Sequence, residues 1–217
     1  YFIRQENEKA LQAANDNDMG VFIISPTDKG GHLHTPSKKL LELCNPLHPI
    51  EFNDLFCLSD NRIHTLSVGA SKPEDLEIHL NAISKIDSMH ELVNIIERRL
   101  IDASYKSLGE SWMTTWHVGL PAWDQTPGEI NIPVLLWLHN LLEAWDMESF
   151  VKDRYSLLGR GGHWFPGANA DSLDCEVSEG DLKKVLTNSP WSDEITFVLR
   201  KLKDRLGGER RDRLWGI

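Results

Sequence analysis

Residues 21–24 form an uninterrupted apolar run, Val21-Phe22-Ile23-Ile24, which is rich in strand-forming side chains and ends at Ser25-Pro26. An apolar run without polar alternation is expected for a strand that is covered on both faces, as strands of parallel sheets usually are. The run is therefore predicted to be a buried strand of a parallel sheet.

Helical and extended patterns alternate on either side of this run. Helices are predicted at residues 6–18, 36–44, 51–58 and 73–86, and a second strand is predicted at residues 61–67. An order in which helices and strands alternate is typical of βαβ units around a parallel sheet. Residues 1–86 are therefore predicted to form an α/β domain.

Beyond residue 86 the pattern becomes helical. Helical stretches are predicted at residues 89–107, at 132–158 as one or two helices, and at 178–206 as two helices broken near Pro190. A Gly-, Pro- and Trp-rich segment at residues 108–128 and an irregular loop at 159–174 separate them. All eight tryptophans lie at or after Trp112, so this part must bury large amphipathic rings. Residues 87–217 are expected to form an all-helical domain.

Charge and cysteine content argue against several classes of protein. The formal net charge is −10 and the acidic residues are spread along the chain, so no nucleic-acid partner is expected. No apolar run is long enough to span a membrane, and no membrane partner is expected. The three cysteines, Cys44, Cys57 and Cys175, are odd in number and far apart, which favours a reducing, cytoplasmic location over a disulfide framework.

Two segments resemble consecutive parts of one family of barrel enzymes. MGVFIISPTDKGG at residues 19–31 is similar to the penultimate barrel strand of aldo/keto reductases, where Ser-Pro and a Gly-bearing loop end the strand. IHTLSVGASKPEDLE at residues 63–77 is similar to the last strand, phosphate loop and following helix of that family. The resemblance implies that residues 1–86 are the C-terminal segments, about strands 6–8, of a (β/α)8 TIM barrel.

The same resemblance implies a site for the phosphates of NADP. In such barrels a phosphate often lies in the loops after the last two strands, beside a helix N-terminus. Ser71 and Lys72 are expected to hold the adenosine-side phosphate. The expected cofactor-binding residues are Ser25, Pro26, Thr27, Gly30, Gly31, Gly69, Ser71, Lys72, Asp75 and His79.

The segment around Lys72 also allows other interpretations. Asp75 and His79 stand where the family has a Gln and part of a Glu-Asn pair, and a carboxylate at 75 would repel a 2′-phosphate. A purely structural interpretation makes Ser71 the N-cap of a helix that has Pro73 in its first turn. Both interpretations are compatible with the residues.

No catalytic residue is expected in this chain, because the catalytic Asp, Tyr, Lys and His of the family lie on earlier strands. The resemblance implies part of an NADP-dependent oxidoreductase that reduces an aldehyde or ketone. Since the chain begins at Tyr1 with sequence typical of the middle of a domain, it is expected to be a fragment. Its unpaired strand edges are expected to bind the missing N-terminal barrel part or a second copy.

Two other classes of function remain open at this point. One is a barrel relic that binds a nucleotide or a protein without turnover, which the residues at 75, 78 and 79 motivate. The other is a self-contained helical interaction module. The resemblance implies that the chemistry belongs to an intact parent protein and that this chain alone is inactive.

The second half resembles the ferredoxin-like extension found in one branch of the family. TPGEINIP at residues 126–133 keeps the Asn-Ile-Pro helix start of that extension, but residues 116–125 contain no cysteine. Cys175 alone cannot hold a [4Fe–4S] cluster, so no iron–sulfur cluster is expected.

Histidines and a cysteine outside these motifs allow further interpretations. His32 and His34 could bind a metal together with Asp28, but a polar surface loop is the favoured interpretation. Cys57 is expected to be a small core residue.

Overall fold

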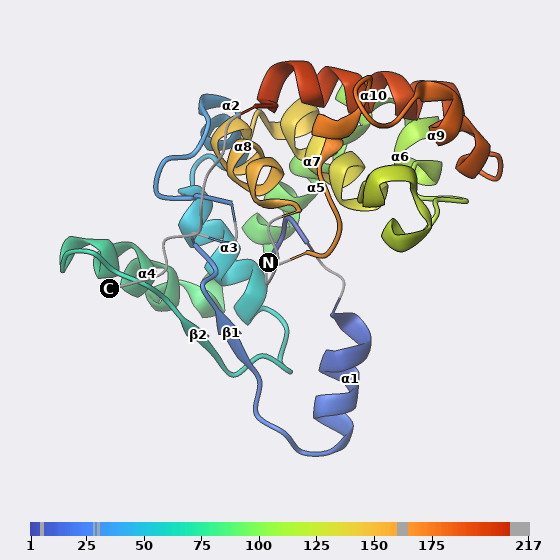
Figure 1. Cartoon of the computed structure of the whole chain (residues 1–217). Helices are drawn as coiled ribbons and strands as arrows, with labels where there is room; N and C mark the ends of the chain where they lie inside the picture. Colours follow the sequence, from blue (N-terminus) through green and yellow to red (C-terminus); the bar gives the residue numbers. More distant parts are fainter. Residues whose placement is uncertain (5–6, 28, 30, 160–164, 209–217) are drawn as a thin grey trace. The chain divides into compact units, whose positions relative to one another are not determined.

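The computed structural model describes residues 1–4, 7–27, 29, 31–159 and 165–208, in which most of the regular structure is helical. The chain divides into two compact units, and Figure 1 labels helices and strands of each. Unit 1 comprises residues 1–103 together with Trp145–Met147, and unit 2 comprises Ser104–Ala144 and Glu148–Ile217. None of the described helices is long and apolar enough to cross a membrane.

Unit 1 follows the predicted order of helices and strands. Its elements are α1 (Glu8–Asp16), β1 (Phe22–Ile24), α2 (Lys38–Cys44), α3 (Pro49–Leu58), β2 (Thr65–Ser67), α4 (Glu74–Ser84), the short 3-10 helix η1 (Ile86–Ser88) and most of α5 (His90–Leu108). The two strands pair in parallel, with Phe22 opposite Thr65 and Ile24 opposite Ser67. The mixed α/β character of this unit is thereby confirmed, within the described residues, as a sheet of two strands.

The burial predicted for the first strand is wrong. Phe22 is 70% exposed and Ile24 is 63% exposed, while Ile23 between them is half-buried. In the part of the chain that the structure describes, β1 pairs with β2 alone, so the face that carries Phe22 and Ile24 is left open to solvent. The apolar run correctly predicts the strand and its parallel pairing but not what covers it.

Helix α3 forms the centre of unit 1. It begins at Pro49, two positions before the predicted start, because His48 caps it: the His48 Nδ1 accepts from the Ile50 N–H, and the Glu51 carboxylate accepts from the His48 N–H. Eight of its residues are buried, including Ile50, Phe52 and Leu55. Such complete burial makes α3 the element against which the rest of the unit packs.

An aromatic cluster closes one end of α3. The ring of Phe2 lies 5.2 Å from that of Phe52, 5.3 Å from that of Phe56 and 5.3 Å from that of Trp145. Trp145 also donates from its indole N–H to the Leu100 carbonyl at 3.0 Å. The chain therefore returns to unit 1 at Trp145, and the first part of α5 belongs there too, so the boundary lies beyond the one expected after residue 86.

Unit 2 contains the helices that the periodicity predicts, together with one short helix that it does not. They are α6 (Glu110–Thr115), α7 (Ile132–Trp145), α8 (Glu148–Leu157), α9 (Glu179–Val185) and α10 (Ser192–Leu206), with the 3-10 helices η2 (Trp123–Gln125), η3 (Pro127–Glu129) and η4 (Ala170–Ser172) between them. The 132–158 stretch is two helices, and α9 and α10 are separated near Pro190 as expected. Helix α6 was not predicted, because the Trp-rich segment around it shows no clear period.

Two tryptophans show how unit 2 buries its rings. The indole N–H of Trp112 donates to the Asn140 side-chain oxygen at 2.8 Å, and that of Trp191 donates to the Thr115 hydroxyl at 2.9 Å. The two rings meet edge to face at 5.3 Å. Each N–H thus has a partner, as buried indoles require. The expectation that this part of the chain buries tryptophans is confirmed for Trp112, whereas Trp191 is half-buried.

Candidate nucleotide-phosphate site

The parallel pairing of β1 and β2 brings the two predicted phosphate loops to one end of the sheet. Ile24 lies opposite Ser67, and the Ser25 N–H donates to the Ser67 carbonyl at 3.0 Å, so the chain leaves both strands at the same edge. Figure 1 shows the two strands side by side in unit 1. The carboxyl ends of parallel strands are where ligand sites form in α/β folds.

The loop after β1 is fastened to α3. Pro26 and Thr27 are buried, and the Pro26 carbonyl accepts from the Asn53 side-chain amide at 3.2 Å. The same Asn53 side chain accepts from the Phe2 N–H at 3.1 Å. Ser25 takes a left-handed conformation, with φ of 52°. Within this loop, Asp28 and Gly30 lie outside the described residues.

Gly31 has a packing role that the sequence did not indicate. Its φ is 132°, and a Cβ at this position would lie 2.5 Å from Cε of Met147 and 3.1 Å from Cδ2 of Leu33. The residue is buried. The need for glycine here therefore follows mainly from the backbone conformation, independently of any phosphate, because the methyl end of Met147 can move aside whereas the positive φ cannot be relieved.

The loop after β2 is exposed and carries the predicted cation. Gly69, Ser71 and Lys72 are exposed. The N–H groups of Ser71 and Lys72 donate to the same carboxylate oxygen of Asp75, at 2.9 Å and 3.2 Å. A carboxylate from the first turn of α4 thus lies where an anion was expected, at the positive end of the helix.

The electrostatics of Asp75 agree with this geometry. The backbone N–H of Ser71 is the main cause that holds the pKa of the Asp75 carboxyl below its usual range, and the N–H and charge of Lys72 contribute. The structural interpretation of Ser71 as N-cap is wrong, since Pro73 occupies that position and α4 has no side-chain cap there. Asp75 binds the loop instead, from inside the helix.

His79 lies away from both loops, in the interior of the unit. It is buried, and its Nδ1 lies 2.5 Å from the Asp54 carboxylate of α3. Burial raises the pKa of Asp54, and the bond to His79 opposes that shift. Neither the His79 Nε2 nor the second Asp54 oxygen has a hydrogen-bond partner in the structure. The pair joins α3 to α4, which also contact each other extensively.

The pair was missed because its members are 25 positions apart and belong to different helices. The available signal was the polarity of α3, in which Glu51, Asn53 and Asp54 interrupt an otherwise apolar segment. Polar side chains inside a buried helix need partners, so such an interruption indicates contacts to other elements. Glu51 also has such a contact, because its carboxylate forms an ion pair with the Lys85 ammonium at 2.7 Å.

The remaining predicted residues fall at separate places. His34 is exposed and His32 is half-buried, while Asp28 is outside the described residues. Across the part of the chain that is described, no group of three His, Cys, Asp or Glu side chains could hold a metal ion. Cys57 is buried as predicted, and burial raises the pKa of its thiol. Cys175 is exposed.

No protein-family model, curated protein or solved structure matches this chain. A function is therefore inferred from its own residues and their geometry.

Proposed function

We propose that this chain supplies the cofactor-phosphate end of an NADP-dependent oxidoreductase of the aldo/keto reductase type, which reduces aldehydes or ketones. The observation that carries the proposal is the parallel register of β1 and β2, which brings the Ser25–Gly31 and Gly69–Lys72 loops to one edge. NADPH supplies the hydride when bound. The catalytic tetrad belongs to the rest of the barrel, so this chain positions the nucleotide and does no chemistry.

The loop after β2 fits a phosphate in one respect and resists it in another. Its Ser71 and Lys72 N–H groups already converge on one anionic oxygen of Asp75, which is what a phosphate oxygen would require. For a phosphate to take that place, the Asp75 side chain must turn away. Lys72 is exposed beside it and offers an ammonium to the incoming charge.

Calorimetric titration with NADPH and with 2′,5′-ADP tests this role. Lys72→Ala is expected to weaken binding of both roughly three- to tenfold, because a charge-assisted contact is lost. Lys38→Ala, which removes an exposed lysine from α2, is the matched control and should leave both affinities unchanged. Asp75→Asn is expected to tighten binding roughly fivefold by removing the competing charge. Asp87→Asn is the control for that change.

A second candidate function is a barrel relic that binds a protein or another nucleotide without turnover. Two observations favour it: Asp75 occupies the N–H groups of the loop, and His79 is directed to Asp54 instead of toward a ligand. It predicts no saturable NADPH binding by the wild type or by Asp75→Asn. Saturable NADPH binding by the wild type or by Asp75→Asn would contradict this alternative.

The proposal includes a partner for the open face of the sheet. Phe22 and Ile24 expose large apolar side chains there, and α4 exposes Leu80 and Ile83. The proposed occupant is the N-terminal part of a barrel or a second copy of the chain. Light scattering over a range of concentrations separates the two, because self-association depends on the concentration of this chain alone.

The proposal also includes a cytoplasmic location and no iron–sulfur cluster. The three cysteines are free, and two of them, Cys44 and Cys57, are buried in unit 1. Cys175 is the single cysteine of unit 2, and a [4Fe–4S] cluster needs about four thiolates.

A further inference from the structure

A cleft of about 720 Å³ lies in unit 1, away from the phosphate loops. Its apolar lining comes from α1, β1, α3 and α5, through Leu11, Ile23, Phe56 and Val93. Cys57 also lines it, while being almost fully buried. The volume lies within the range of small-molecule sites.

Helix α1 forms one wall of this cleft but is weakly anchored. None of its nine residues is buried, and Leu11 and Ala14 are half-buried. Its N-cap residue, Asn7, makes no side-chain cap hydrogen bond. An isolated helix of this length is unstable in water, so α1 depends on its contacts with the rest of the unit.

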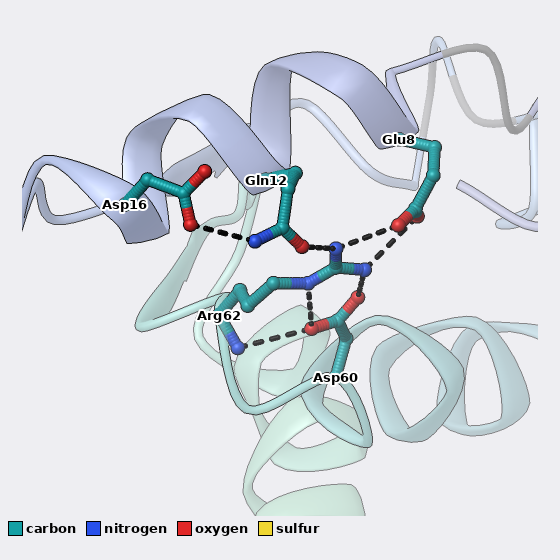
Figure 2. Close-up of polar contacts among 5 residues, drawn as sticks. All are labelled: Glu8, Gln12, Asp16, Asp60 and Arg62. Atoms are coloured by element: carbon teal, nitrogen blue, oxygen red, sulfur yellow. Dashed lines mark hydrogen bonds and ion pairs between the residues drawn. The ribbon is translucent and has the colours of Figure 1, made fainter.

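Arg62 provides the polar contact that holds α1, as Figure 2 shows. Its guanidinium binds both carboxylate oxygens of Glu8, at 2.6 Å and 2.9 Å, and the Gln12 side-chain oxygen at 3.3 Å. Glu8 and Gln12 are one turn apart on α1 and face the same way. Gln12 in turn donates to Asp16 at 2.7 Å, which extends the contact along the helix.

The other side of the guanidinium is fixed to its own loop. The Arg62 Nε and Nη2 donate to the two Asp60 oxygens at 2.9 Å and 2.6 Å, and the Arg62 backbone N–H donates to Asp60 at 3.0 Å. The Arg62 side chain is 17% exposed, whereas that of Glu8 is 69% exposed. Asp60 therefore holds the Arg62 guanidinium in place, and the exposed Glu8 carboxylate on α1 is the partner that can separate from it.

We propose that α1 is a lid over this cleft and that Arg62 is its latch. An ion pair with one exposed partner is weak and screened by salt, so the contact breaks often without loss of the fold. Release of Glu8 and Gln12 lets α1 swing away, while Arg62 stays on Asp60. A small molecule then reaches the floor of the cleft at Phe56 and Cys57.

The three cysteines allow a direct test by alkylation with iodoacetamide, followed by peptide mass spectrometry. Cys57 reports opening of the cleft, buried Cys44 reports unfolding of the unit, and exposed Cys175 reports the reagent itself. When closing is faster than labelling, the labelling rate follows the open population. Glu8→Ala changes an exposed side chain and leaves the core intact.

Glu8→Ala is expected to label Cys57 roughly two- to fivefold faster, with Cys44 unchanged. The matched control is Glu42→Ala, which removes a carboxylate of similar exposure, 66%, from the Lys38 ion pair of α2. High salt should speed Cys57 labelling in the wild type but not in Glu8→Ala. The proposal is overturned if Cys57 does not respond, or if Cys44 accelerates equally, which would mean unfolding of the unit.

Discussion

The two loops at the same end of the sheet are held in opposite ways. The first is built into unit 1, with Thr27 and Gly31 buried. The second is exposed at Ser71 and Lys72, and one carboxylate, that of Asp75, holds two of its N–H groups. A ligand bound between the loops would contact the buried first loop without changing it, but it would have to displace the Asp75 carboxylate from the second loop. The first loop would therefore position the ligand, and the free energy of displacing Asp75 would lower its affinity.

The largest effect should come from filling the space at Gly31. Gly31→Ala must hold a side chain at a φ of 132°, which residues with a Cβ rarely adopt, and must also move the end of Met147, so it is expected to lower the free energy of unfolding by about 3 kcal/mol. Gly69→Ala in the second loop, where a Cβ meets nothing within 4 Å, should change it by less than about 0.5 kcal/mol. Chemical denaturation followed by circular dichroism measures both. Equal losses of unfolding free energy in the two variants would show that the two loops do not differ in how tightly they are held.

The next effect concerns the attachment of the first loop to α3. Asn53→Ala leaves the Phe2 N–H and the Pro26 carbonyl without their buried partner, so a loss of about 2 kcal/mol is expected. Asn81→Ala, at an exposed position of α4, is the control. If the two variants unfold at the same denaturant concentration, Asn53 does not fasten the loop.

The smallest effect should come from Asp75. Because its pKa is lowered in the folded protein, the Asp75 carboxylate stabilises the fold above its ordinary pKa of 3.8, and this contribution is lost as the pH falls through the lowered value. Asp75→Asn should therefore lower Tm slightly at pH 7, by about a degree, and by progressively less as the pH falls through the lowered pKa. Thermal melts across this range measure the difference. A difference that persists at low pH would show that charge is not its cause.

The helices and the parallel pairing of the strands could be predicted from the sequence, because they follow from local periodicity and from the order of elements along the chain. The apolar run at 21–24 identified a parallel strand, and the pattern at 178–206 identified a break near Pro190. The exposure of Phe22 and Ile24 was not predictable in this way. The solvent exposure of these side chains depends on how many strands and helices pack around β1. Local sequence patterns do not determine this number.

The meeting of the two loops was predictable from the sequence, but the contacts of their residues were not. The register of β1 and β2 joined the two loops as expected, yet Asp75 was read as a repulsive charge and is in fact the group that binds the loop. The partners of His79 and Arg62 lie 25 and 54 positions away. Such contacts arise from tertiary packing, so they could be recognised only as polar residues in need of partners.

The return of the chain to unit 1 at Trp145–Met147 has a consequence for synthesis. The ring of Phe2, at the start of the chain, packs against Trp145, and the Ser37 hydroxyl donates to the Trp145 carbonyl at 2.7 Å. Domains that fold during translation usually do so from the N-terminus onward. Here the core of the first unit is completed only by residues that are synthesised at the end of α7 and after it, namely Trp145 and Met147.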